Sequence, residues 1–322
     1  MFTISPELLS ASTVAIRDCM GGRPGEKVLI VTDRHLRLIG YALHRAATDL
    51  GLEVLLLDMP PRQSNGEEPP PEVAELMAKA DVVLCPTSKS LTHTDARRRA
   101  SAAGARVATL PGVTEVIMVR CMNADYHEIA ARTHRLCERL EQAAVVRVRA
   151  PAGTDISMPI AGRRAHASSG LFREAGQWGN LPTGEAYLAP VEGRSNGVVV
   201  VDGSMAGIGL VKTPIRIEVK DGFAEEITGG AEARALVDLL AMHGRDARTV
   251  AEFGIGTNDK AILTGAIIED EKVMGTIHIA LGDNKSMGGS VRVASHLDGL
   301  IRWPTVWLDD EKIMEDGTLL VV

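Results

Sequence analysis

Apolar residues in the first 145 positions form short continuous runs, and each run is followed by a stretch with helical periodicity. The runs are KVLIVTD (27–33), EVLLLDM (53–59), DVVLCPTS (81–88) and RVATLPG (106–112). Helical periodicity follows over 35–50, 72–80, 95–103 and 126–143. Continuous apolar strands that alternate with helices indicate a parallel sheet covered on both faces. The pattern therefore predicts an α/β fold, with a Rossmann-like domain over residues 1–145.

From about residue 146 the pattern changes to short segments in which apolar and polar residues alternate. VVRVRAP, TDISMPIAG, GVVVVDG and RIEVKDG are typical, and Gly-Asp turns separate several of them. One clear helix is expected, over residues 231–242. We predict that residues 146–322 form a second, mainly β domain of mixed α+β character.

The first domain lacks the motifs with which doubly wound sheets bind nucleotides. No strand is followed by G-x-G-x-x-G or by G-x-x-x-x-G-K-[ST], and the turn Thr32-Asp33-Arg34-His35 after the first strand contains no glycine. We therefore expect a scaffold without a dinucleotide, and the function must be argued from side chains elsewhere.

Charge and composition exclude some classes of partner. The 322 residues are 45% hydrophobic and 24% charged, which is ordinary for a globular protein, and the formal net charge is −7. There is no basic run with interleaved aromatic residues, and the chain has only four Phe, three Trp and three Tyr. We expect no nucleic-acid partner.

The cysteines and the N-terminus suggest a reducing compartment. The four cysteines show no C-x-x-C spacing, so they are expected to be buried thiols. The start, MFTISPELLSAS, lacks the features of a secretory signal, and no apolar stretch of about 18 residues is present. The expectation is a cytoplasmic protein without a membrane span.

Most of the candidate functional residues lie between positions 252 and 303. His296 and Asp298 occupy alternate positions, so on a strand their side chains point the same way. Glu252 and His278 lie within apolar, glycine-containing segments, and Glu185 lies in NLPTGEAYLAP. Each alone has an ordinary interpretation as an exposed strand residue or a core histidine. As a set of carboxylates and imidazoles they predict a metal site, because these ligands suit zinc, manganese, iron and cobalt.

Other polar residues are weaker candidates. His93 lies in a loop at the carboxyl end of a strand and is a candidate to face a substrate, and His166 is a candidate to meet an anionic group. The run Glu269-Asp270-Glu271 is most simply a solvated turn.

Four segments, LPTGEAYLAP, AEFGIG, HIALG and SHLDG, resemble in this order the aminopeptidase T family of dinuclear metallopeptidases. The resemblance implies a dimer with two divalent ions, typically zinc, cobalt or magnesium, and an N-terminal residue cleaved from small peptides by a metal-bound water. Manganese also suits such ligands. The implied metal ligands are Glu185, Glu252, His278, His296 and Asp298. Either Glu252 or Asp298 is a candidate bridge between the ions, and Glu252 is also a candidate catalytic residue.

Two features depart from that family. Lys285 stands where the family places a tyrosine, and it is a candidate oxyanion donor or the mark of a different substrate. The chain length and the segment GDNKSMGG resemble a sister group, the 2,5-dihydroxypyridine dioxygenases, which hold one iron with two histidines and one aspartate. His296 and Asp298 match two of those ligands, whereas the third, a histidine, falls at Glu252.

Three hypotheses follow for the activity. The ligand set favours a metallo-aminopeptidase-like hydrolase of small peptides or related amides, which is the leading prediction. The chain length and the segment GDNKSMGG favour the alternative, a non-haem Fe(II) ring-cleaving dioxygenase acting on a small molecule. The third is a non-enzymatic binding protein that retains the fold without the chemistry.

Overall fold

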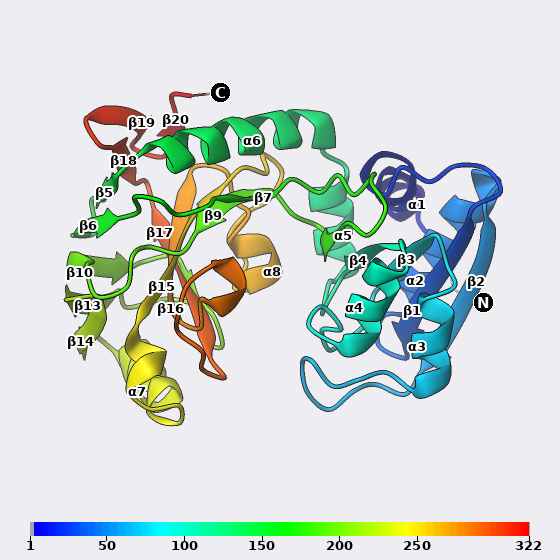
Figure 1. The fold of residues 1–322 in the computed structure, drawn as a ribbon, viewed down its shortest axis with the longest axis horizontal. Coiled ribbons are helices and arrows are strands. Elements are labelled where there is room, and N and C mark those ends of the chain that lie inside the picture. The colour runs from blue at the N-terminus through cyan, green and yellow to red at the C-terminus, as the bar shows by residue number, and fades with distance from the viewer. Residues whose placement is uncertain (1–2, 322) are drawn as a thin grey trace. The chain divides into compact units, whose positions relative to one another are not determined.

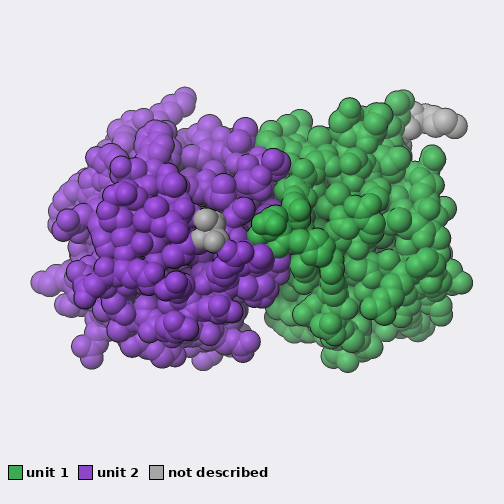
Figure 2. Space-filling view, turned by 90° about the horizontal axis from the view of Figure 1, so that it is seen from above, with its two compact units in different colours: residues 1–128, 170–183 green, residues 129–169, 184–322 purple. Residues whose placement is uncertain are grey.

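The computed structural model describes residues 3–321, which divide into two compact units. Unit 1 comprises residues 1–128 and 170–183, and unit 2 comprises residues 129–169 and 184–322, as coloured in Figure 2. The chain therefore passes three times from one unit to the other. The predicted boundary between residues 145 and 146 lies inside unit 2, and unit 1 also includes the later segment 170–183.

Helices form over all five stretches in which helical periodicity was found, and the described part of the chain has three further α-helices outside them (Figure 1). The α-helices are α1 (Pro6–Val14), α2 (Arg37–Asp49), α3 (Pro71–Met77), α4 (Asp95–Ala102), α5 (Glu115–Met122), α6 (Tyr126–Gln142), α7 (Ala231–Ala241) and α8 (Ile267–Asp270). A π-helical turn, η1 (Ala15–Cys19), and two 3-10 turns, η2 (Arg245–Arg248) and η3 (Lys285–Met287), complete the set. Several helices begin at a side chain that caps the first turn; Thr94, for example, accepts a hydrogen bond from the backbone N–H of Arg97 at the start of α4.

Unit 1 is built on a five-stranded parallel sheet with the order β2-β1-β3-β4-β8. Its strands are β1 (Lys27–Asp33), β2 (Glu53–Met59), β3 (Val82–Cys85), β4 (Arg106–Thr109) and β8 (Trp178–Asn180). The interior strands are apolar on both faces because helices cover both, and Val31, Val83 and Val107 lie in one core with residues of α3 and α4. The predicted α/β class and parallel sheet are confirmed.

Unit 2 contains two antiparallel sheets. The eight-stranded sheet has the order β14-β13-β10-β6-β5-β18-β19-β20, and the seven-stranded sheet has the order β12-β11-β17-β16-β15-β9-β7. The strands of the first are β5 (Val145–Arg149), β6 (Asp155–Pro159), β10 (Asn196–Val201), β13 (Ile215–Lys220), β14 (Phe223–Thr228), β18 (Thr305–Leu308), β19 (Glu311–Glu315) and β20 (Thr318–Leu319). Those of the second are β7 (His166–Ser168), β9 (Glu185–Leu188), β11 (Ser204–Met205), β12 (Gly209–Leu210), β15 (Val250–Gly256), β16 (Thr276–Gly282) and β17 (His296–Arg302).

The core of unit 2 fixes which way the side chains of the seven-stranded sheet point. Phe253 and Ile255 on β15, with Ile277 and Ile279 on β16, are buried in a cluster that also contains residues of the eight-stranded sheet, α6 and α7. Since side chains alternate along a strand, the intervening positions of β15 and β16 face the opposite side of the sheet. That face carries the polar residues of the candidate site.

Two further expectations concern cysteines and membranes. All four cysteines are buried thiols. Between residues 3 and 321, no helix has both the length and the apolar character needed to cross a bilayer.

Candidate metal centre

Four neighbouring strands of the seven-stranded sheet carry the five predicted ligands. Glu185 begins β9, Glu252 lies on β15, His278 lies on β16, and His296 and Asp298 lie on β17. In the register of the sheet Gly256 pairs with Glu185, Gly254 with His278, and Ala280 with both Glu252 and Asp298. Strand pairing therefore brings together on one face five residues that the sequence spreads over 114 positions, from 185 to 298.

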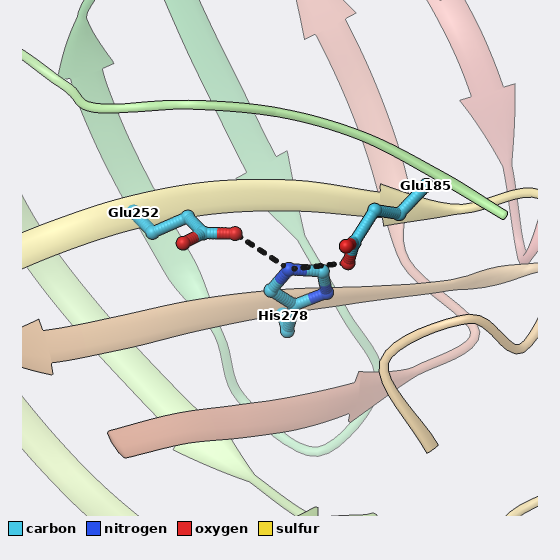
Figure 3. A group of neighbouring side chains, drawn as sticks. All are labelled: Glu185, Glu252 and His278. Atoms are coloured by element: carbon cyan, nitrogen blue, oxygen red, sulfur yellow. Dashed lines mark hydrogen bonds and ion pairs between the residues drawn. The ribbon is translucent and has the colours of Figure 1, made fainter. Parts of the chain in front are cut away.

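The inner part of the site is a group of three buried side chains, Glu185, Glu252 and His278, whose potential ligand atoms all lie within 4.8 Å of one another. Figure 3 shows the imidazole of His278 between the two carboxylates. Its Nε2 atom lies 3.0 Å from Oε1 of Glu252 and 3.6 Å from Oε2 of Glu185. Gly254 makes room for this ring, because a Cβ atom at that position would lie 2.0 Å from His278 Nε2.

The outer part is formed by Glu252, His296 and Asp298, again within 4.8 Å of one another. His296 Nε2 lies 3.1 Å from Oε2 of Glu252 and 3.4 Å from Oδ1 of Asp298. Glu252 belongs to both groups, one oxygen facing each histidine. The His296 side chain is 32% exposed whereas that of His278 is fully buried, so solvent reaches the outer group.

The orientation of His296 is set by its other nitrogen. Nδ1 lies 2.7 Å from the backbone carbonyl oxygen of Asp283, which can only accept, so Nδ1 carries the hydrogen. Nε2 then faces the two carboxylates. A backbone acceptor on the far nitrogen is the usual way in which proteins orient a histidine that binds a metal.

The carboxylates strongly affect the protonation of both histidines in the absence of a cation. Burial disfavours the charged imidazole of His278, but Glu252, Glu185 and Asp298 outweigh it and raise its pKa to about 9. Burial likewise opposes protonation of His296, and Asp298 and Glu252 nevertheless raise its pKa well above the usual value. Burial would raise the pKa of Glu252, yet its contacts with the two histidines hold that pKa well below the usual range.

Lys272 is a member of the cluster that the sequence did not reveal. Its side chain is 2% exposed, and its ammonium donates to Oε1 of Glu185 at 2.6 Å and to Oε1 of Glu271. Burial is the main cause that raises the pKa of the Glu271 carboxyl, and the negative charges of Glu185 and Asp298 raise it further. The positive charge of Lys272 opposes this shift. A lysine beside three acidic residues in the sequence resembles a solvated turn, so only the fold shows its role.

The prediction of a solvated turn over residues 269–271 is wrong for its first two members. Glu269 and Asp270 are fully buried. Asp270 accepts hydrogen bonds from the backbone N–H groups of Thr264 (2.7 Å) and Gly265 (2.9 Å), and Glu269 accepts one from Ile262 (3.1 Å). These carboxylates are buried because they satisfy the backbone donors of an irregular loop.

Glu192 holds the loop between β16 and β17, from which His296 emerges. Its carboxylate accepts from the Asn284 side chain at 2.9 Å and from the Ser290 backbone at 2.7 Å, and it pairs with Arg163. Arg163 also donates to the backbone oxygen of Gly288 at 3.1 Å. Glu192 therefore holds two points of the loop directly and a third through Arg163.

The remaining sequence candidates lie elsewhere. Lys285 is exposed on η3, where its backbone N–H donates to Asp283, and its catalytic role stays a prediction. His93 is in unit 1, with its ring 6.4 Å from that of Trp178. His166, on β7, stacks on Tyr187 at 5.3 Å, and its Nε2 atom is buried without a hydrogen-bond partner in the described part of the chain.

The donor set and its charges fit a divalent cation. Glu185, Glu252 and Asp298 are each at most 7% exposed, and among the described residues the buried ammonium in their cluster is that of Lys272. Buried carboxylates are costly unless they are paired. Oδ1 of Asp298 is buried and has no hydrogen-bond partner within residues 3–321. A metal ion that replaced the protons of the histidines would still neutralise the carboxylates and would give Asp298 Oδ1 a partner. Imidazole with carboxylate suits iron, manganese, cobalt or zinc.

Two comparisons of the sequence with known proteins point to the same family. A family model described as 2,5-dihydroxypyridine 5,6-dioxygenase matches residues 11–321. A curated 2,5-dihydroxypyridine 5,6-dioxygenase from Pseudomonas putida is 26% identical over 199 residues, which cover 56% of this chain and 55% of that relative, so the alignment spans about half of its length.

Two solved structures share the whole fold. The structure of 2,5-dihydroxypyridine dioxygenase from Pseudomonas putida KT2440 is similar with a TM-score of 0.85 and 20% identity, covering 99% of both chains. AmpT from Thermus thermophilus is similar with a TM-score of 0.70 and 19% identity, covering 99% of this chain and 100% of that one. At such identities both likenesses concern the fold alone.

The leading sequence hypothesis, an aminopeptidase-like hydrolase, is wrong. The family model that overturns it matches almost the whole chain and describes a dioxygenase, and the curated relative has the same name. The metalloprotease assignment and the choice of zinc, cobalt or magnesium that came with it lose their basis. What this chain shares with AmpT is the fold.

Proposed function

Because the chain belongs to the 2,5-dihydroxypyridine 5,6-dioxygenase family, we propose that it is an iron-dependent dioxygenase that opens the ring of a dihydroxylated pyridine or a closely related aromatic compound. The observation that carries the proposal is the convergence of two imidazoles and three carboxylates on one face of a sheet. Family membership indicates the reaction class, and the donor set is suited to hold the metal that this reaction needs.

The outer group, Glu252, His296 and Asp298, is the proposed iron site. It combines nitrogen and oxygen donors, and His296 is partly open to solvent, so a substrate and dioxygen can approach. Bound ferrous iron would supply the redox chemistry that dioxygen requires and that no side chain provides.

The protein orients these donors and controls their protons. The Asp283 carbonyl oxygen holds the hydrogen of His296 on Nδ1, which leaves Nε2 available to a cation once its proton is lost. His278 Nε2 supports Oε1 of Glu252 from the buried side, and the sheet excludes water there. Cation binding therefore releases protons from the cluster.

The direct test is oxygen consumption by protein loaded with ferrous iron under anaerobic conditions and then given 2,5-dihydroxypyridine and air. We expect one dioxygen consumed per substrate, and with ¹⁸O₂ both labelled atoms in a ring-opened acid. Asp298→Asn should abolish this uptake, whereas Asp310→Asn, at a side chain that is 98% exposed, should not. An iron-loaded protein that consumes no oxygen with any dihydroxypyridine would favour the non-enzymatic binding protein.

A further inference from the structure

The two halves of the donor cluster differ in how their charges are neutralised. In the outer half, Asp298 Oδ1 is buried without a hydrogen-bond partner within the described range. In the inner half, Oε1 of Glu185 already accepts from the Lys272 ammonium at 2.6 Å. A lysine ammonium is therefore built into the inner half, whereas in the outer half, among the described residues, Asp298 is paired with the imidazole of His296 alone, at 3.4 Å.

The backbone around Lys272 is held close to the end of β15 that pairs with Glu185. Gly256, the residue of β15 that pairs with Glu185, lies directly against the turn at residues 272–273, because a Cβ atom on Gly256 would be 2.2 Å from the Val273 carbonyl oxygen. The Lys272 carbonyl oxygen accepts from the Asn258 backbone at 2.9 Å. The turn is thus fixed beside the strand end at which Glu185 lies.

A metal ion in the inner half would have to share Glu185 with this ammonium. The remaining donors there are Oε2 of Glu185, Oε1 of Glu252 and Nε2 of His278. Two cations on one buried carboxylate repel each other strongly, because water does not screen them. The ammonium is covalently attached and thus has no association entropy to lose, so it is the occupant that remains.

We propose that Lys272 is a resident cation that fills the inner half and limits this centre to one metal ion, held by Glu252, His296 and Asp298. The inference rests on the proposed metal-binding role of the cluster. Glu185 and His278 then act as positioning residues: Glu185 holds Lys272, and His278 orients Glu252. The two-metal expectation of the sequence is replaced by one metal and one lysine.

The test is the number of ions bound, measured on metal-free full-length protein with Mn²⁺ by equilibrium dialysis and by electron paramagnetic resonance. Wild type should bind one Mn²⁺ per chain with the signal of an isolated ion. Lys272→Gln should bind two, and exchange coupling through Glu252 should broaden the signal. Lys272→Arg keeps the charge and should bind one, as should the matched control Lys312→Gln at a half-exposed lysine far from the cluster in sequence.

Each outcome decides a different point. Two ions in wild type, or one ion in Lys272→Gln, would overturn the role of Lys272 while leaving the metal site intact. No Mn²⁺ in any variant would overturn the metal-binding proposal itself. If Lys272→Gln does not fold, Glu185→Gln tests the same inference, because Glu185 is then a partner of Lys272 and not a metal ligand. One ion bound with an affinity within about threefold of wild type supports the inference, and loss of that ion contradicts it.

Discussion

Both the parallel sheet of unit 1 and the seven-stranded sheet of unit 2 gather buried polar side chains, but only the second leaves them unsatisfied. At the carboxyl ends of β1 and β3, Asp33 accepts from the backbone and the hydroxyl of Ser88, both at 2.6 Å. Nearby, Thr109 donates to Asn180 at 2.7 Å. In unit 2, by contrast, Asp298 Oδ1 and His278 Nδ1 are buried without partners in the described part of the chain.

The difference shows that topology alone does not locate this site. The order β2-β1-β3-β4 reverses direction between β1 and β3, which is where open α/β sheets commonly bind ligands. Here the Asp33 carboxylate at that point already accepts two hydrogen bonds from Ser88. The buried polar atoms without hydrogen-bond partners lie on an antiparallel sheet, for which no such rule exists. Such atoms are therefore a better guide to the functional site than the order of the strands.

The strongest test of this difference between the two sheets is a matched pair of substitutions, one in each sheet. Asp298→Asn should lower turnover by a factor on the order of 10³ or more, because a metal ligand is lost. Its free energy of unfolding should change little, since a poorly paired buried carboxylate is relieved. Asp33→Asn should do the reverse: about 1–3 kcal/mol of stability lost and unchanged turnover per folded molecule. Urea unfolding and oxygen uptake measure both, and a stability loss confined to Asp298→Asn would contradict the contrast.

Metal binding should stabilise one sheet and not the other. At a metal concentration of about one hundred times Kd, binding stabilises the occupied state by about 2.7 kcal/mol, which slows exchange through opening of the site about 100-fold. We expect this slowing at amides of β15–β17 and none at amides of β1, β3 and β4. Hydrogen exchange with mass spectrometry, with and without a chelator, gives the answer. Equal slowing in both sheets would show that the site is not local.

The space above Gly254 provides a smaller, geometric test. Gly254→Ala places a methyl group where His278 Nε2 lies, so the imidazole must move and Glu252 loses its support. Metal affinity should fall by about 10–100-fold, the usual cost of losing an outer-shell partner. In a double-mutant cycle with His278→Ala, the alanine at 254 should cost little more, because the clash is gone. Additive losses would mean that the methyl group acts elsewhere.

The smallest expected effect concerns Glu192 and acid pH. Burial opposes its charge, but hydrogen bonds from Ser290, its own backbone and Asn284, with Arg163, lower its pKa to about 2. A lowered folded-state pKa contributes stability above the unfolded value near 4.5, and this is lost as pH falls from there toward 2. Glu192→Gln should therefore be less stable than wild type by about 1–2 kcal/mol at pH 6. The gap should narrow as pH falls below about 4.5 and nearly close by about pH 2 in urea titrations, and a gap that is constant with pH would exclude the charge.

Much of the fold followed from the hydrophobic pattern. The continuous runs at 27–33 and 53–59 are β1 and β2 with the same bounds. β1 is buried on both faces, which leaves a continuous apolar run, and the edge strand β2 has a similar run although most of its residues are half-buried or exposed. The strand β8 was not foreseen. Its residues, Trp178–Asn180, come after a long excursion into unit 2, and three residues carry too little periodicity to reveal a strand that returns to the first sheet.

The candidate ligands were found because imidazole and carboxylate in apolar strand segments are conspicuous. The residues that support them were not, since their roles depend on contacts between distant segments. Lys272 is 87 residues from Glu185, and Glu192 is 92 residues from Asn284. The glycines in VAEFGIG were a usable signal: Gly254 and Gly256 alternate on one face, which marks where something approaches a strand closely.

The three passages of the chain between the units have a consequence for how the polypeptide can be divided. Residues 170–183 complete the first sheet, yet they are synthesised only after residues 129–169 of the other unit. No single cut yields two complete pieces, and a fragment ending at residue 128 lacks β8, against which Arg97 stacks on Trp178 at 3.7 Å. Ribosomal synthesis must therefore begin the second unit before the first can close its sheet, and a recombination event that exchanged either unit would need more than one crossover.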